Sequence, residues 1–262
     1  MIKIGCQTVA FVPQLTDFLD EVLEKIAAMG YAGVEIGARF IKTPARFSKI
    51  TSELGLEIAG LHYGANLWDE AGFEQSRADF EQVARLAERL SCPRIVLSGV
   101  GPQDRSLDRE DLGVQVDGLN QLGEIAKKHG AKVYYHNHAW EFQDDERVIQ
   151  SIVRGTAREV VGLALDLGWA EYAGSDPIKT IERYRDRIGH LHIRDLRGST
   201  FVELGNGSTD VHTIIQQLQK MNYSDWLVVE MEPHALSYGG KLSPAESIAM
   251  GYGFLKALLY HG

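Results

Sequence analysis

Short apolar runs recur at regular intervals along this chain, and a polar loop and an amphipathic segment of helical period follow them. We count eight such runs in 262 residues, or about one run in every 33 residues. That length suits a strand, a crossover helix and two loops. The runs are Ile2–Cys6, Gly33–Ile36, Glu57–His62, Arg94–Ser98, Lys132–His138, Val161–Asp166, Ile188–Ile193 and Trp226–Met231.

The pattern within the segments indicates parallel strands separated by helices. Runs such as Arg94-Ile95-Val96-Leu97 are continuously apolar, as expected for parallel strands that are covered on both faces. Apolar residues spaced three and four apart predict helices over 15–26 and 80–90, with Thr16 as the N-cap of the first. Asp176-Pro177 predicts the start of a later helix.

The number of strand–helix units predicts the fold class. Eight units in a chain without a visible interdomain linker favour a single (β/α)8 TIM barrel over residues 1–262. An open, doubly wound sheet is less favoured because no G-x-G-x-x-G motif follows a strand. The Gly205-Asn206-Gly207 segment is not followed by a helix start of the right form for a nucleotide site.

Composition excludes several classes of function. The 27 Lys and Arg against 36 Asp and Glu give a net charge of −9, which disfavours binding to nucleic acid or to an anionic membrane. The two cysteines, Cys6 and Cys92, exclude a disulfide scaffold and a Cys-rich zinc module. No signal peptide and no run of about 18 apolar residues is visible, so we expect a cytoplasmic protein.

Ionisable side chains gather at the ends of the last four runs. The carboxyl ends of barrel strands meet at one rim, and strand side chains alternate between the two faces. An inward-pointing set at this rim would contain His136, Asp166, His192 and Glu230. Two imidazoles and two carboxylates are costly to bury without compensation. A divalent ion such as manganese, zinc, cobalt, iron or magnesium would provide it, so we predict one metal ion here.

Each of these residues has a simpler interpretation when it is taken alone. A single His at a strand end is more often a hydrogen-bonded core or loop residue. Four ionisable residues at successive strand ends favour a metal or catalytic site instead. His138 and His190 stay open as the structural members of their pairs, and Glu35 and His62 lie near the ends of the second and third runs.

Several segments carry a resemblance to a known family. They are Gly30–Glu35, the H-N-H-x-x-E-F pattern of His136–Phe142, His190–Asp195, Leu204–Asp210 and Trp226–Glu230. With them the chain resembles the sugar phosphate isomerase/epimerase superfamily, the xylose isomerase-like TIM barrels, over almost its whole length. Relatives there include inosose dehydratase, hydroxypyruvate isomerase and the ketohexose 3-epimerases.

The resemblance implies a metal site with one ligand from each of strands five to eight. Asp166, His192 and Glu230 match the family's ligands on strands six, seven and eight. His136 stands where the family usually has a glutamate on strand five. That departure disfavours an epimerase mechanism in which two metal-bound glutamates face each other across the substrate.

The same resemblance implies the chemistry and the substrate class. We expect a metal-dependent isomerase or epimerase that acts on a keto-sugar, a sugar phosphate or a related polyol ketone through proton abstraction and an enediolate. Glu230 is predicted to be both ligand and base, with His138 or Glu141 as the second proton carrier. The residues predicted to bind substrate are His62, Trp169 and Arg197.

Other outcomes stay open at this stage. Proton abstraction is also the first step of a lyase or dehydratase reaction. The enzyme would then resemble inosose dehydratase or act as a 3-keto-glycoside eliminase. A non-catalytic sugar-binding barrel, a homo-oligomer and a subunit of a hetero-oligomeric lyase are further alternatives. A DNA-repair nuclease of this fold is disfavoured, because Trp169 stands three residues after Asp166, where such an enzyme would carry a histidine.

Overall fold

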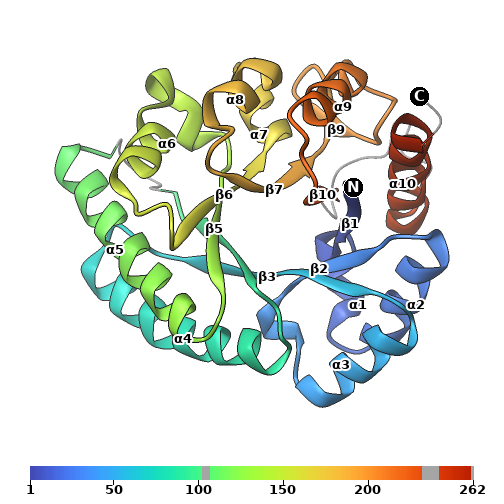
Figure 1. Ribbon diagram of the computed structural model, residues 1–262, viewed down its shortest axis with the longest axis horizontal. Helices are drawn as coiled ribbons and strands as arrows, with labels where there is room; N and C mark the ends of the chain where they lie inside the picture. Colours follow the sequence, from blue (N-terminus) through green and yellow to red (C-terminus); the bar gives the residue numbers. More distant parts are fainter. Residues whose placement is uncertain (102–106, 232–241, 261–262) are drawn as a thin grey trace.

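Eight parallel strands close into a barrel in the computed structural model, which describes residues 1–101, 107–231 and 242–260 (Figure 1). Around the barrel the strands follow the order β1-β10-β7-β6-β5-β4-β3-β2. Each barrel strand therefore pairs with the barrel strands that precede and follow it in the chain, and β10 closes the barrel against β1. Their bounds are β1 (Lys3–Gln7), β2 (Gly33–Gly37), β3 (Glu57–Ala65), β4 (Arg94–Gly99), β5 (Lys132–His136), β6 (Val161–Asp166), β7 (Ile188–Ile193) and β10 (Trp226–Val229).

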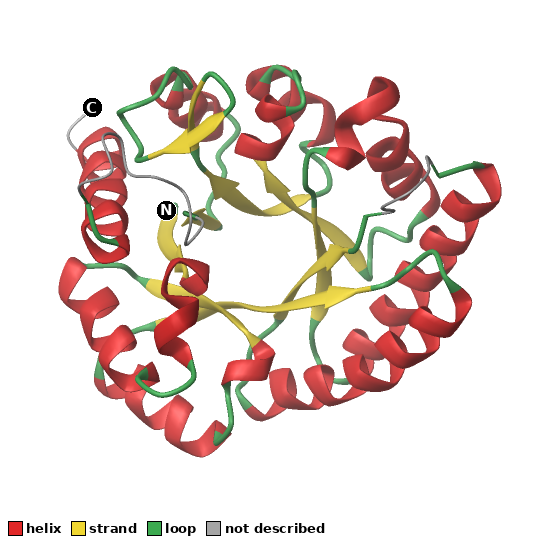
Figure 2. Ribbon diagram, turned by 180° about the vertical axis from the view of Figure 1, so that it is seen from behind, coloured by secondary structure: helices red, strands yellow, loops and turns green. Residues whose placement is uncertain are grey.

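Helices surround the barrel on its outside (Figure 2). The α-helices are α1 (Val12–Leu15), α2 (Leu19–Met29), α3 (Pro44–Glu53), α4 (Glu70–Arg89), α5 (Arg109–Lys128), α6 (Gln143–Gly155), α7 (Leu167–Tyr172), α8 (Pro177–Tyr184), α9 (Val211–Lys220) and α10 (Pro244–Tyr260). Short 3-10 helices also follow strand ends, namely η1 (Thr8–Phe11), η2 (Ala38–Phe40) and η3 (Trp140–Phe142).

Local chemistry explains where several helices begin. Asp69, Asp108, Asp176 and Asp210 occupy the N-cap positions of α4, α5, α8 and α9, and each carboxylate accepts a backbone N–H of the first turn. Such caps satisfy donors that a helix leaves unpaired, and each is worth about 1 kcal/mol. The polar start and the buried apolar stripe of each helix together fix its orientation on the sheet.

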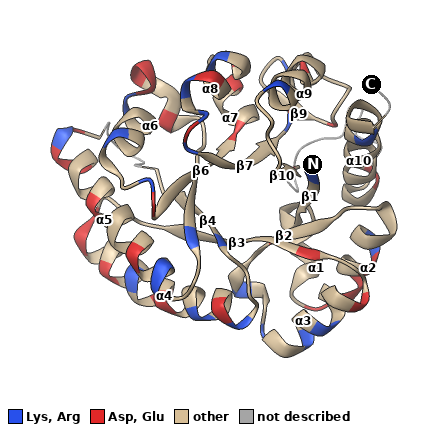
Figure 3. Cartoon of the chain, in the orientation of Figure 1, with Lys and Arg blue, Asp and Glu red and all other residues tan. Residues whose placement is uncertain are grey.

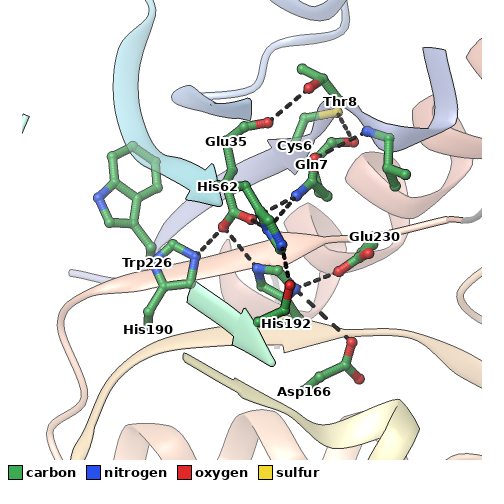
Figure 4. A network of polar contacts seen from close by, with 12 residues as sticks. Cys6, Gln7, Thr8, Glu35, His62, Asp166, His190, His192, Trp226 and Glu230 are labelled. Atoms are coloured by element: carbon green, nitrogen blue, oxygen red, sulfur yellow. Dashed lines mark hydrogen bonds and ion pairs between the residues drawn. The ribbon is translucent and has the colours of Figure 1, made fainter. Parts of the chain in front are cut away.

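The interior of the barrel is apolar near the strand starts and polar toward the strand ends. Trp226, the first residue of β10, forms a small buried cluster with Ala59 and Val228. Gly33 lies against it, and a Cβ there would come within 2.6 Å of the Trp226 ring. Glycine is therefore required where the indole fills the barrel. Figure 4 shows Trp226 beside His190, where the polar layer begins.

The predicted barrel is confirmed, and most predicted runs match strands to within one or two residues. β3 is longer than predicted, because it continues to Ala65. β5 ends at His136 and β10 ends at Val229, so His138 and Glu230 lie just beyond their strands.

Two local features differ from the sequence analysis. Thr16 was predicted as the N-cap of a helix, and this is wrong. Residues Val12–Leu15 form their own short helix with Pro13 in its first turn, Thr16 ends that helix, and Phe18 occupies the N-cap position of α2. An unpredicted antiparallel hairpin, β8 (Asp195–Arg197) with β9 (Thr200–Val202), follows β7.

The charges lie mainly on the outer helices. Figure 3 shows acidic and basic residues interspersed over α4 and α5 rather than separated into fields of one sign. Within the described ranges, no helix is both long enough and apolar enough to cross a bilayer.

Candidate metal centre

Four side chains from four neighbouring strand ends converge at the carboxyl rim of the barrel. His136, Asp166, His192 and Glu230 each offer one ligand atom, and these atoms all lie within 4.8 Å of one another. All four residues are buried, and Glu230 is the most exposed at 7%. The structure therefore brings together the four residues that the sequence analysis proposed as ligands.

Strand register and one amide place Asp166 in this group. Asp166 pairs with His192 across β6 and β7, so the two side chains start side by side. Asn137, directly after β5, accepts from the Asp166 N–H at 2.9 Å and donates to its carbonyl at 3.0 Å. Asp166 Oδ1 also accepts the Trp169 N–H at 2.8 Å and so caps α7. Three elements thus fix the position of one carboxylate.

Arg194 lies between the two carboxylates of the group. Its Nε donates to Asp166 Oδ2 at 2.8 Å, and its Nη2 lies 2.5 Å from Glu230 Oε1. The guanidinium also lies 5.3 Å from the centre of the Trp169 ring, within cation–π range. Arg194 is only 2% exposed, so these contacts take the place of the hydration that the guanidinium would have in solvent.

A third buried carboxylate, Glu35 of β2, reaches across the barrel to β7. Its Oε2 lies 2.7 Å from His190 Nε2 and 2.8 Å from His192 Nε2 (Figure 4). Its Oε1 lies 2.6 Å from Gln7 Nε2 and 2.9 Å from His62 Nδ1. The sequence analysis noted Glu35 at a strand end but gave it no role. The signal in the sequence that could have indicated a role for Glu35 is the presence of a carboxylate within an otherwise apolar strand.

These contacts shift the protonation of the buried groups. Burial would raise the pKa of Glu35, but the charge of His192 and hydrogen bonds from three histidines outweigh it and hold that pKa well below its usual range. Burial would also raise the pKa of Glu230, yet Arg194 and His192 lower it to about 2. Burial would lower the pKa of His192, but Glu35 and Glu230 raise it to about 10. Both carboxylates are therefore ionised at neutral pH.

His136 has the opposite protonation. Burial, followed by the nearby His192 and His138, lowers the pKa of His136 well below its usual range. The ring is therefore neutral at pH 7. Its Nδ1 is buried and has no hydrogen-bond partner. A buried ring nitrogen without a partner is costly unless something else binds it.

The donor set and the charge both fit a divalent metal. Asp166, Glu230 and Glu35 carry three negative charges, and Arg194 carries one positive charge. His192 is cationic in the metal-free protein, and a metal ion on this ring would displace its extra proton and leave it neutral. With His192 neutral, the excess of two negative charges in this buried group equals the charge of one divalent cation. Two imidazoles and two carboxylates suit zinc, manganese, cobalt or iron. His136, Asp166, His192 and Glu230 would hold that ion.

A cavity of about 410 Å³ opens onto this centre. His62, His136, His138 and Glu230 contribute to its wall, together with Arg39 and Phe40 of η2 and with Tyr63. The ring centres of His136 and His138 are 5.0 Å apart and the rings are perpendicular. The structure thus brings the predicted residues His62 and His138 to the same cavity as two of the ligands.

Glu141 lies behind His138 rather than in the cavity wall. Its Oε1 accepts from the Tyr135 hydroxyl at 2.7 Å, and its Oε2 accepts from the His138 backbone N–H at 2.8 Å. Burial raises the pKa of Glu141 to about 8, although these two hydrogen bonds oppose the shift. Burial also lowers the pKa of His138, whose Nδ1 is buried without a hydrogen-bond partner.

The other two predicted substrate residues lie elsewhere. Trp169 lines a second cavity of about 400 Å³, together with Trp140, Gly99, Gly101 and His138. His138 is thus shared by both cavities. Arg197 is exposed on β8, outside the lining of either cavity, and donates to the carbonyl of Asn206.

Comparison with known proteins identifies the family. A family model described as "Xylose isomerase-like TIM barrel" matches residues 23–258. The chain is 26% identical to an inosose dehydratase of Geobacillus kaustophilus, over 88% of this chain and 87% of that protein. It is 28% identical to an inosose dehydratase of Bacillus licheniformis, over 82% of this chain and 81% of that protein.

Solved structures share the fold. An IolI protein with a bound zinc atom superposes with a TM-score of 0.81 at 20% identity, covering 99% of both chains. The 3-keto-D-glucoside 4-epimerase YcjR of E. coli gives a TM-score of 0.79 at 22% identity, covering 98% of this chain and 100% of that one. The family predicted from the sequence is confirmed: this chain belongs to the xylose isomerase-like TIM barrel family.

Proposed function

We propose that the protein is a divalent-metal-dependent lyase that removes water from a cyclic polyol ketone or a related keto-sugar. The observation that carries the proposal is the position of His138. This neutral, mostly buried imidazole shares the wall of one cavity with Glu230 and His136 of the ligand group. The inosose dehydratases, whose name describes the removal of water from a keto-inositol, are relatives over more than four fifths of the chain.

The four ligands and Arg194 provide the binding end of the site. A divalent ion held by His136, Asp166, His192 and Glu230 would supply Lewis-acid stabilisation of the negative charge that develops on substrate oxygens. The low pKa of Glu230 makes it a weak base and a good ligand. We therefore give Glu230 the ligand role in this proposal and assign proton transfer to His138.

His138 is suited to move the proton because burial keeps its imidazole neutral. In the proposed reaction the C–H bond beside the carbonyl breaks, its proton passes to His138, and its electron pair forms an enolate. The carbonyl then re-forms and the hydroxyl on the next carbon leaves. His138 returns its proton to this hydroxyl, so the products are one water and an unsaturated ketone, without any change of overall oxidation state.

We assign Glu141 a positioning role. Both of its oxygens accept hydrogen bonds from within the protein, and one of these donors is the backbone N–H of His138. Glu141 therefore holds the turn that carries His138 rather than touching the substrate. His62, which lines the cavity on the β3 side, is our proposed substrate contact.

An isomerase or epimerase starts with the same proton removal and stays a prediction. It differs in its ending, because the proton returns to carbon and no water leaves. The test is to incubate manganese-loaded protein with an inosose in D2O and to follow the reaction by proton NMR and mass spectrometry. A product one water lighter supports the lyase, whereas deuterium uptake without loss of water supports the isomerase or epimerase.

Two variants complete this experiment. His138→Gln removes the proton carrier, and we expect it to keep its metal and lose turnover. His129→Gln is the matched control, because His129 lies on the outer surface between Glu81 and Glu88 and faces neither cavity. Bound metal without conversion or deuterium uptake in the unmodified protein, over a panel of inososes and keto-sugars, would favour the sugar-binding alternative.

A second candidate function follows from the second cavity. Its Trp140 and Trp169 rings suit the apolar face of a sugar or an aromatic group, and His138 links it to the metal centre. A 3-keto-glycoside could place its keto ring at the metal and its other half in this cavity. The leaving group would then be an alcohol instead of water. Comparison of an inosose with an aryl 3-keto-glucoside as substrates separates the two candidates.

A further inference from the structure

Glu35 joins a candidate metal ligand to a residue of the cavity wall. It extends from β2 across the barrel to His192 of β7, 157 positions later in the chain, and on its near side it meets His62 of β3. Glu35 is fully buried and no solvent reaches its carboxylate. Figure 4 shows the side chains of Gln7, His62, His190 and His192 directed toward it.

The chemistry of a carboxylate determines where the protons of its partners lie. An ionised carboxylate only accepts hydrogen bonds, so a ring nitrogen 2.8 Å away must carry a proton. This places a proton on His192 Nε2. The other nitrogen, Nδ1, faces Glu230 and lies 4.0 Å from Asp166 Oδ2. A metal ligand must offer a bare nitrogen. Nδ1 is the nitrogen on the ligand side, and a metal ion would replace the proton that it shares with Glu230.

The same reasoning applies to His62. The Gln7 amide is oriented because its Oε1 accepts the Val9 N–H at 3.0 Å, which leaves its Nε2 to donate to Glu35. His62 Nδ1 lies 2.9 Å from Glu35 Oε1 and therefore also donates. In the neutral form of the ring this leaves His62 Nε2 bare, 3.1 Å from Ser98 Oγ, which lines the cavity. His62 thus offers a hydrogen-bond acceptor toward the substrate side.

We propose that Glu35 is a positioning residue that sets the tautomers of both histidines. It holds His192 with Nδ1 toward the metal, and it holds His62 with Nε2 toward the cavity. The His192 half of this inference rests on the metal site of the proposed function. The His62 half depends only on the hydrogen bonds of Glu35.

A second metal ion between Glu35, His190 and His192 is the competing explanation, since these residues could also group around an ion. Metal–ligand distances of about 2.0–2.2 Å keep two ligand atoms of one ion about 3 Å or more apart. The Glu35 oxygen lies only 2.7 and 2.8 Å from the two ring nitrogens, which are hydrogen-bond lengths. We therefore assign shared protons to the Glu35 contacts, and the number of zinc ions per chain tests that assignment.

The first test reads the tautomers directly. Protein labelled with 15N-histidine is loaded with zinc, which is diamagnetic, and its imidazole nitrogens are observed by two-bond 15N–1H NMR. His192 is assigned from its absence in His192→Ala. We expect zinc on Nδ1 and a proton on Nε2 of His192, and a proton on Nδ1 of His62. Zinc on Nε2 of His192, a proton on Nε2 of neutral His62, or two zinc ions per chain would overturn the proposal.

The second test removes the carboxylate. Glu35→Gln keeps the shape but cannot accept from four donors, so we expect its zinc affinity to fall by about 10–100-fold. Glu203→Gln is the matched control, because Glu203 is equally buried but bonds to Ser247 and Asn206 instead. We expect its zinc affinity to stay within about threefold of the unmodified protein. Unchanged affinity and tautomers in Glu35→Gln would show that Glu35 is only structural.

Failure of the proposed function can be told apart from failure of this inference. If Glu35→Gln does not fold, the NMR experiment on the unmodified protein decides. If the unmodified protein binds no zinc, the metal site falls, and the tautomer of His62 in that protein decides the role of Glu35. Absence of lyase activity in a protein that binds zinc through His192 Nδ1 leaves this inference in place.

Discussion

Arg194 donates from Nε to Oδ2 of Asp166 over 2.8 Å, and the pair is almost completely buried. An isolated buried ion pair gains little stability, because desolvation of both charges offsets their attraction. Here the guanidinium also meets Glu230, so one cation serves two carboxylates. Against the effect of burial, Arg194 lowers the pKa of Glu230, and the group keeps a net negative charge that a divalent ion would neutralise.

The variant Arg194→Met tests this charge balance. Without the guanidinium, two carboxylates lose a buried partner, and we expect the metal-free protein to be destabilised by about 3–5 kcal/mol. Zinc should restore more stability to the variant than to the unmodified protein, because the remaining charge is more negative. Urea unfolding with zinc and with EDTA measures both effects. An equal gain from zinc in the two proteins would contradict the charge argument.

Removal of one ligand should abolish metal binding without unfolding the barrel. We expect His192→Ala to retain less than about a tenth of the metal held by the unmodified protein, since one ligand is lost and the others stay spread over three strands. His190→Gln is the matched control, because His190 shares the partner Glu35 but is not in the four-ligand group. Metal analysis by mass spectrometry after dialysis gives the ratio. Equal metal content in both variants would contradict the ligand assignment.

The fold and the ligand group could be predicted from the sequence because both depend on local pattern. Apolar runs about 33 residues apart predict the strands, and His136, Asp166 and His192 stand at their ends. The role of Glu35 could not be predicted in this way. Its contact with His192 joins residues 157 positions apart and depends on how far a side chain reaches across a closed barrel.

Two other features escaped the sequence for similar reasons. Arg194 follows β7 directly, and only the folded chain shows that its side chain turns inward between Asp166 and Glu230. The β8–β9 hairpin is built around Asp195, whose carboxylate accepts the backbone N–H groups of Gly205, Gly207 and Thr209. Neither arrangement leaves a periodic signal in the sequence.

Glu141 should make the stability of the protein depend on pH. Burial raises its pKa to about 8 from the ordinary value of 4.5, so between these values the folded state holds a proton that the unfolded state has lost. Stability from this group is complete below about pH 4.5 and falls as the pH rises toward 8, by at most about 1.4 kcal/mol per pH unit. Urea unfolding between pH 5 and 8 measures the slope.

The variant Glu141→Gln should remove this contribution. A glutamine stays neutral at all pH values and can still accept from the His138 N–H while it donates to Tyr135, so we expect a flatter profile than in the unmodified protein. The exposed Glu159→Gln is the control and should keep the original slope. Identical slopes in Glu141→Gln and the unmodified protein would show that Glu141 is ionised when folded.

Trp140 should affect the second candidate substrate class but not the first. It lies in the second cavity, close to Gly101, where a Cβ would come within 3.0 Å of the indole nitrogen. Loss of one aromatic contact costs about 0.5–1.5 kcal/mol, so Trp140→Ala should raise KM for an aryl 3-keto-glucoside up to about tenfold. An inosose fits within the 410 Å³ cavity at the metal centre, and its KM should stay unchanged.

A surface aromatic provides the control for this last prediction, and the pattern of KM values decides it. Phe18 is 53% exposed and lines neither cavity, so Phe18→Ala should leave both KM values unchanged. A rise for the glycoside alone in Trp140→Ala places the second half of the substrate against that indole. Equal rises for both substrates would mean that Trp140 acts through the turn that carries His138. The second cavity would then have no part in substrate selection, and dehydration of a single ring would be the better supported function.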